Sequence, residues 1–259
     1  MPRVASSCFH TKDADSRREE WMEMESSNGH PEEGALRGRA EERIVRVPAG
    51  QAVLDGSLAI PRDAEGIVLF AHGSGSSRHS PRNKYVAGVL QQSGLATLLL
   101  DLLTPDEEAV DLRTRHVRFD IGLLAQRLVS TTDWLARERQ TSNLPIGYFG
   151  ASTGGGAALV AAAMRRDAVH AVVSRGGRPD LAGDALPEVR APTLLIVGGA
   201  DVPVIGMNED AMARMRSEVR LEIVAGATHL FEEPGTLEEV ARLARDWFVH
   251  FLASAHVRR

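Results

Sequence analysis

The chain has 259 residues, 43% of them hydrophobic and 25% charged, which is the composition of a soluble globular protein. Its net charge of −5 argues against nonspecific nucleic-acid binding, and no apolar run approaches the roughly 18 residues of a membrane span. The only cysteine, Cys8, excludes a disulfide framework, so we expect a cytoplasmic protein that binds neither nucleic acid nor membranes.

Residues 1–42 differ in composition from the rest of the chain. They are rich in Glu, Arg, Ser and Gly, and their only apolar cluster is Trp21, Met22 and Met24. Such a segment buries too little apolar surface to offset the entropy lost on ordering. We therefore predict a mobile polar tail over residues 1–42, followed by one domain over residues 43–255.

The domain begins with a predicted hairpin, formed by residues 43–47 and 51–60 around Pro48-Ala49-Gly50. Apolar runs of strand length follow, and helical patterns separate them. The runs lie at 66–72, 95–102, 145–150, 170–174, 193–199 and 221–226, and the helices at about 82–93, 119–138, 152–166, 206–218 and 235–253. Continuous apolar runs are typical of strands buried on both faces. The alternation predicts an α/β domain with eight strands, mostly parallel after an antiparallel start, and helices on both faces of the sheet.

The segment Gly150-Ala151-Ser152-Thr153-Gly154 follows a predicted strand and opens a predicted helix. This is the G-x-S-x-G pattern in its strand–turn–helix context, in which a sharp turn lifts the serine hydroxyl above the sheet. Side chains two residues before or after the serine would collide with the adjacent helix or strand, which favours glycine at both positions. Ser152 is therefore the predicted nucleophile.

Two other interpretations of this turn stay open. Serine is a preferred helix N-cap, so the turn could be purely structural. The glycines at 150, 154 and 156 also match the G-x-x-x-G-x-G turn of short-chain dehydrogenases, with Arg175 placed to hold a 2′-phosphate. Against a nucleotide site, that turn normally follows the first strand, and no Tyr-x-x-x-Lys pair follows here.

A serine nucleophile needs a general base, and in this architecture the histidine comes last in the chain order. Ligand sites of open α/β sheets lie beyond the carboxyl ends of the strands. Only His229 follows Ser152 and lies in such a loop, directly after the last predicted strand. The other histidines after Ser152 open a strand, lie in the last helix or lie in the terminal segment: His170, His250 and His256.

The base in turn needs a carboxylate that orients it. Asp201 follows the strand at 193–199 and precedes His229, so it is the predicted acid. Asp180 and Asp184, in an earlier connection, are the alternatives. Asp101 also ends a strand but precedes the serine.

The negative oxygen of a tetrahedral intermediate needs N–H donors. We predict the N–H of Thr153 and, from the glycine-rich loop at 72–77, the N–H of Ser74, with Gly73 or Gly75 as alternatives. The loop lacks the lysine of a phosphate-binding P-loop. No His/Cys/Glu cluster has metal-ligand spacing, so we predict neither a metal nor a cofactor.

Together these residues resemble the α/β-hydrolase superfamily and, within it, the dienelactone hydrolase family. The similarity covers about residues 43–253, in the segments FAHGSGSSRHSPRN, GYFGASTGGGAA, SRGGRPDLAG, VGGADVPV and GATHLFEEPG. It implies the α/β-hydrolase fold and cleavage of a small-molecule ester through an acyl-enzyme. Dienelactone hydrolases proper use a cysteine nucleophile where this chain has Ser152, so a general carboxylic-ester hydrolase is the expected activity. Some related chains add a phosphoribosyltransferase domain, for which 42 residues are too few.

Other functions are compatible with the same residues. One is a catalytically idle hydrolase fold used for binding, which would need neither a triad nor an oxyanion loop. Another is a thioesterase or peptidase with the same machinery. Arg175 is a candidate for binding a substrate carboxylate, because its planar fork of donors matches that group. Alternatively, Asp180 and Asp184 pair with Arg175 and with the nearby Arg178.

Deletion of residues 1–40 should leave hydrolysis and the thermal midpoint nearly unchanged, since this segment shows no apolar periodicity. Melting curves and an activity assay on the full and shortened chains measure both quantities. A large fall in the midpoint would show instead that the segment packs on the domain, with Trp21 as its anchor.

Overall fold

A computed structural model of the protein describes residues 40–256. Nearly all of the predicted tail, residues 1–39, lies outside the described residues, as do residues 257–259. Within the described part, no helix is both long enough and apolar enough to cross a membrane.

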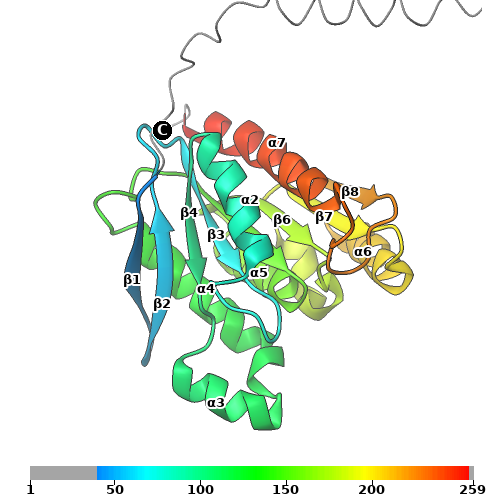
Figure 1. Ribbon diagram of the computed structural model, residues 1–259, viewed down its shortest axis with the longest axis horizontal. Helices are drawn as coiled ribbons and strands as arrows, with labels where there is room; N and C mark the ends of the chain where they lie inside the picture. Colours follow the sequence, from blue (N-terminus) through cyan, green and yellow to red (C-terminus); the bar gives the residue numbers. More distant parts are fainter. Residues whose placement is uncertain (1–39, 257–259) are drawn as a thin grey trace, which may run out of the picture. The chain divides into compact units, whose positions relative to one another are not determined.

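Eight strands form one sheet in the order β1-β2-β4-β3-β5-β6-β7-β8 (Figure 1). Their bounds are Glu42–Ala49, Ala52–Ala59, Gly66–Ala71, Leu95–Leu100, Ile146–Ala151, Val169–Arg175, Thr193–Gly198 and Val219–Val224, for β1 to β8. β1 pairs antiparallel with β2, and β2 pairs antiparallel with β4. The remaining pairs are all parallel. The predicted α/β class, the eight strands and the antiparallel start are therefore confirmed.

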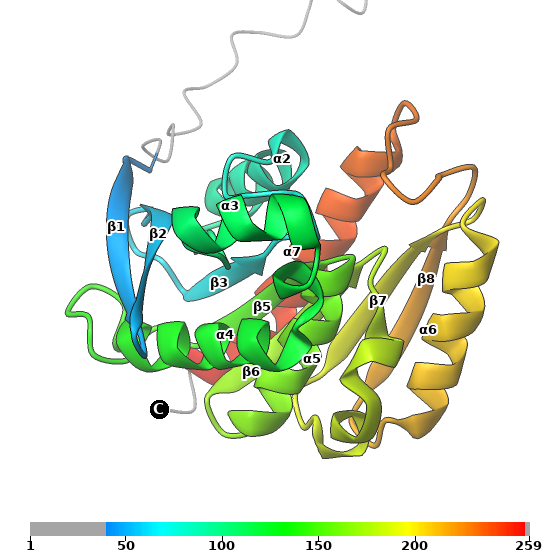
Figure 2. The same cartoon turned by 90° about the horizontal axis from the view of Figure 1, so that it is seen from below.

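Helices cover both faces of this sheet, as predicted (Figures 1 and 2). α2 (Pro81–Gln92) and α7 (Thr236–His256) pack on one face with residues such as Phe70 and Phe149. α4 (Ile121–Leu135), α5 (Thr153–Met164) and α6 (Val202–Arg214) contribute to the core on the other face. This division follows from right-handed crossovers: the chain moves outward from β3 to β4, and then in the opposite direction through β5, β6, β7 and β8.

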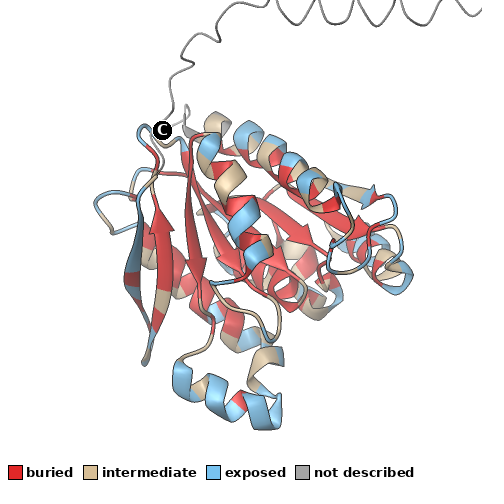
Figure 3. Cartoon of the chain, viewed as in Figure 1, coloured by how far each residue is buried: buried red, intermediate tan, exposed pale blue. Residues whose placement is uncertain are grey.

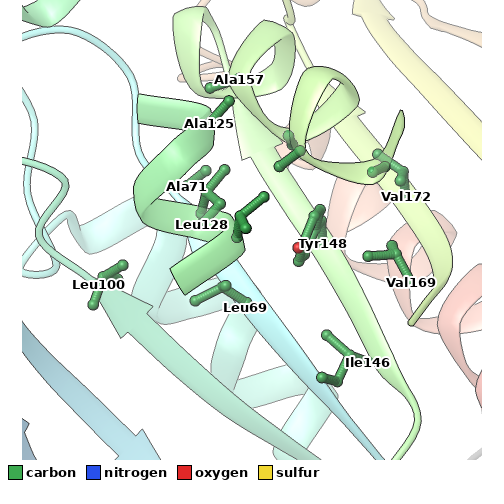
Figure 4. Packing of buried hydrophobic residues seen from close by; sticks show 14 of the residues in the cluster. Leu69, Ala71, Leu100, Ala125, Leu128, Ile146, Tyr148, Ala157, Val169 and Val172 are labelled. Atoms are coloured by element: carbon green, nitrogen blue, oxygen red, sulfur yellow. The ribbon is translucent and has the colours of Figure 1, made fainter. Parts of the chain in front are cut away.

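The central strands β3, β4, β5 and β7 are buried along their whole length (Figure 3). On the α4–α5 side, Leu69 and Tyr148 of the sheet face Leu128 and Ala157 of the helices (Figure 4). The alanine- and glycine-rich sequence of α5 lets this helix lie close against the strands. The continuous apolar runs of the sequence are thus explained by a sheet that has no solvent-exposed face at its centre.

The sequence patterns missed three helical segments. They are α3 (Pro105–Thr114) and the 3-10 segments η1 (Val117–Phe119) and η2 (Pro179–Glu188). α3 is mostly exposed and buries only Asp111, so it has no apolar stripe (Figure 3). Its start nevertheless carries a signal: Thr104 accepts from the Glu107 N–H, the Glu107 carboxylate accepts from the Thr104 N–H, and Pro105 is the first helical residue.

Candidate active site

The turn between β5 and α5 has the geometry that the G-x-S-x-G pattern predicts. Ser152 has φ 51° and ψ −121°, a backbone conformation that is strained for any residue with a side chain. A Cβ atom on Gly154 would lie 2.3 Å from the carbonyl oxygen of Ala71, and one on Gly150 would lie 2.5 Å from the Cα of Gly155. Only glycine fits at either position, because in each case the obstruction is backbone.

Three side chains from three different strand ends meet at this turn. Asp201 follows β7, and His229 lies in the loop between β8 and α7. His229 Nδ1 is 2.6 Å from Asp201 Oδ2, and His229 Nε2 is 3.4 Å from Ser152 Oγ. The carboxylate thus fixes one ring nitrogen and leaves the other facing the hydroxyl. The second distance is long for a hydrogen bond, but such contacts commonly tighten when substrate binds.

The alternatives considered for acid and base lie elsewhere or have other partners. Asp180 accepts two hydrogen bonds from Arg178, at 2.8 and 2.7 Å, and Asp184 pairs with Arg214 at 3.2 Å. Asp101 is held by the backbone and side chain of Arg78. His170 lies near the start of β6 and His250 within α7, so neither is at the carboxyl edge of the sheet.

The glycine-rich loop after β3 lies against Ser152, since a Cβ on Gly73 would be 3.1 Å from Ser152 Cβ. The Ser74 N–H, predicted as an oxyanion donor, instead donates to Thr153 Oγ1 at 3.0 Å. It could therefore serve a substrate oxygen only by exchanging this partner. Thr153 is 3% exposed, and its N–H belongs to the first turn of α5, whose donors have no acceptor within the helix.

His72, which the sequence analysis did not single out, holds the start of this loop in place. Its Nδ1 lies 2.9 Å from the Gly73 carbonyl oxygen, and its Nε2 accepts a 3.0 Å hydrogen bond from the Leu102 N–H. Because Nε2 accepts, the proton is on Nδ1 and the ring is neutral. Burial lowers the pKa of His72 below its usual value, outweighing the Gly73 carbonyl and the carboxylates of Asp101 and Glu108, which raise it.

A pocket of about 270 Å³ opens beside the loop, between the end of β4 and α3. Hydroxyl, acidic and apolar side chains line it, among them His72, Ser74, Asp101, Leu112, Arg118 and Thr153. Residues of α3 form one wall of the pocket, and Asp111 of this helix is bound to Arg118. The pocket reaches Thr153, the residue after Ser152.

Arg175 is the last residue of β6, and its side chain is buried. Its guanidinium lies 6.0 Å from the ring centroid of Phe231, in the loop that carries His229. The alternative in which Asp180 or Asp184 pairs with Arg175 is wrong, because those carboxylates bind Arg178 and Arg214. Burial, helped by the nearby charge of Arg82, lowers the pKa of Arg175 to about 10.

Among residues 40–256, no group of three or more His, Cys, Asp or Glu side chains is arranged to hold a metal ion.

Comparison with known proteins places this chain among hydrolases. The model of the dienelactone hydrolase family matches residues 54–253. A crystal structure of a dienelactone hydrolase from Anabaena variabilis is 66% identical, covers 83% of this chain and all of its own, and has a TM-score of 0.82. Est1E from Butyrivibrio proteoclasticus is 17% identical over 81% of this chain and 99% of its own; its TM-score of 0.68 shows the fold alone.

A curated relative from Mycobacterium tuberculosis carries a different kind of name, "Putative phosphoribosyl transferase". It is 59% identical over 225 residues, which are 85% of this chain and 50% of the relative. The chain thus spans about half the length of this protein.

Replacement Gly154→Ala should destabilise the protein by about 2 kcal/mol or more, because the new methyl group would overlap the carbonyl oxygens of Ala71 and His72. Gly88→Ala is the matched control: it lies within α2 with nothing inside 4 Å, so it should stabilise by about 0.5–1 kcal/mol. Denaturant unfolding of both variants measures the difference. Equal stability of the two would contradict the close approach at the turn.

The lowered pKa of His72 makes part of the stability pH-dependent. Below about pH 6.5 the unfolded chain takes up a proton that the folded chain does not, so stability falls as the pH drops toward the folded pKa. The thermal midpoint of His72→Gln should therefore fall less between pH 7.5 and 5 than that of the unmodified protein. His79→Gln, an exposed histidine of the same segment, is the control and should behave like the unmodified protein. Identical falls in all three proteins would contradict this assignment.

Proposed function

The chain belongs to the dienelactone hydrolase family, and on that premise we propose that it is a serine hydrolase that cleaves carboxylic esters through an acyl-enzyme intermediate. The observation that carries the proposal is the chain of contacts from Asp201 Oδ2 through His229 to Ser152 Oγ. A module used only for binding has no need of this arrangement on a strained turn.

In the first step His229 Nε2 takes the proton of Ser152 as Oγ bonds to the ester carbonyl carbon. The carbonyl electron pair moves onto its oxygen, which the Thr153 N–H stabilises, together with the Ser74 N–H once that donor is released from Thr153 Oγ1. Collapse of this intermediate breaks the ester bond, and the departing alkoxide takes the proton from His229. Asp201 holds the ring in position and stabilises its positive charge.

In the second step water replaces the alcohol. His229 takes a proton from the water as the water oxygen attacks the acyl carbon. The bond from that carbon to Ser152 Oγ then breaks, His229 returns the proton to Oγ, and the acid product leaves. The proposal requires no cofactor. It places the enzyme in the cytoplasm, which the single cysteine of the sequence supports.

Dienelactone as the substrate is not part of this proposal, because the nucleophile is a serine. The transferase name of the mycobacterial relative is not part of it either, since half of that protein lies outside the match. The proposal concerns the domain that the family model covers, and a small-molecule ester is its substrate class.

Ser152→Ala should fold normally and lose ester hydrolysis by a factor on the order of 10⁶, as triad nucleophiles do. Turnover of a panel of 4-nitrophenyl esters measures this, and labelling by a fluorophosphonate probe should disappear with the activity. Ser93→Ala, at the end of α2, is the control and should keep both.

Retention of more than a tenth of the rate in Ser152→Ala would remove this residue from the mechanism. Ser152-dependent cleavage of thioesters or peptides, with no cleavage of esters, would keep the nucleophile and overturn the ester specificity.

A further inference from the structure

The strand β8 forms one edge of the sheet, because it comes last in the strand order and pairs with β7 on one side. Along a strand, the N–H and C=O groups of successive residues point alternately to the two sides. The carbonyl oxygens of Glu218 and Val224 accept hydrogen bonds from the residues that open and follow β7. The even-numbered residues of β8 therefore face β7. The N–H and C=O groups of Val219, Leu221 and Ile223 point away from the sheet.

This edge lacks the devices by which sheets commonly prevent pairing with another strand. Those devices include proline, lysine and bulges. The opposite edge strand, β1, contains Pro48, whereas β8 contains neither proline nor lysine and pairs with β7 in a regular register. The Ile223 side chain is 48% exposed, and β8 is tan and blue in Figure 3 where the central strands are red. The edge at β8 is thus open and partly apolar.

The charges on β8 alternate in sign. Arg220 and Glu222 lie on one face of the strand, and Arg220 Nε is 2.5 Å from Glu222 Oε1. The Arg220 side chain is 66% exposed. Both residues line an open groove of about 410 Å³ between β8 and α7, with Asp246 and Trp247 on the side of the helix. Because the two charges balance, they do not repel every other strand and select one of complementary pattern.

A second copy of β8 has that complementary pattern when it runs antiparallel to the first. Hydrogen bonding requires that each outward-pointing residue lies opposite an outward-pointing residue of the second copy. With the twofold axis at Leu221, all three of these residues are paired, and Val219 lies opposite Ile223 of the second copy. Arg220 then lies opposite Glu222 of the second copy, at positions where cross-strand side chains approach most closely.

The neighbouring registers are disfavoured by the same charges. With the axis at Arg220, the two copies of this arginine face each other. With the axis at Glu222, the two carboxylates face each other, and like charges directly opposite one another are destabilising. Each of these registers also leaves one outward-pointing residue of the strand without a partner. Charge and hydrogen bonding therefore select the same register, the one centred on Leu221.

We propose that β8 is the interface of a homodimer, in which two copies of the chain pair antiparallel about Leu221 and their two sheets form one continuous sheet. The interface is isologous, so the same residues contribute from both copies. The carboxyl ends of the two sets of parallel strands point in opposite directions. Each copy keeps its own Ser152, Asp201 and His229, so this inference does not rest on the proposed esterase function.

Sedimentation velocity of the full chain, across the micromolar concentration range, tests the dimer. We expect a species of twice the mass of one chain, which dissociates on dilution. A monomer at every concentration overturns the proposal.

Charge reversal tests the register. Arg220→Glu places two carboxylates opposite each other at both symmetric positions, and Glu222→Arg does the same with two guanidinium groups. Each single change should raise the dimer Kd by about 10- to 100-fold, as expected when two attractive cross-strand pairs become repulsive. The double change Arg220→Glu with Glu222→Arg restores opposite charges and should return the Kd to within a few-fold of the unmodified protein.

Mixing the two single variants gives the sharpest outcome. In a heterodimer of Arg220→Glu with Glu222→Arg every cross-strand pair is attractive, so the mixture should form dimers that neither variant forms alone at the same concentration. This rescue also shows that both variants are folded. Arg46→Glu, an exposed position on the opposite edge strand, is the matched control and should leave the Kd unchanged. A dimer that reversal at 220 or 222 does not weaken, or that Arg46→Glu weakens equally, overturns the proposal.

Discussion

The approach of the β5–α5 turn to the end of β3 is the constraint on which the site depends. At Gly154 the turn lies so close to the carbonyl oxygens of Ala71 and His72 that no side chain fits between them. This contact brings Ser152 and the glycine-rich loop together, because Ser152 follows one strand and Gly73 the other. Both are at the point where the chain reverses its direction across the sheet, which is where open α/β sheets bind ligands.

The order of the parallel strands places the other side chains of the site at the same edge of the sheet. β5, β6, β7 and β8 are consecutive neighbours in the sheet, so their carboxyl ends lie along one edge. Ser152, Arg175, Asp201 and His229 each follow or end one of these strands, and each therefore reaches the same edge from a different connection. β5 and β7, the strands before Ser152 and Asp201, are buried along their whole length.

Much of this could be predicted from the sequence, because the relevant signals are local. Continuous apolar runs predict the strands. A residue that directly follows such a run is predicted to lie at the carboxyl edge of the sheet. His72, by contrast, acts through a hydrogen bond to Leu102, thirty residues away on another connection, and no local pattern shows that pairing. The hydrogen bond from the Ser74 N–H to Thr153 Oγ1 could not be predicted for a similar reason, since its acceptor is a side chain 79 residues away. The apolar pattern did not predict α3, because this helix has a capping box but no apolar face.

At this edge of the sheet, strained backbone conformations occur at Ser152 and in the loop that carries His229. Ser152 and Phe231 are two of the four non-glycine residues with positive φ among the described residues, at 51° and 55°. Such conformations persist only where the surroundings determine them, and a bulky aromatic residue is a rare occupant. Phe231 is 1% exposed, so burial of its ring in the core beside α7 compensates for the strain and fixes the loop that carries His229. The same ring lies under the guanidinium of Arg175, so the packing that holds the loop of His229 also contacts this cation. The buried ring of Phe231 thus contacts both the loop of His229 and the side chain of Arg175.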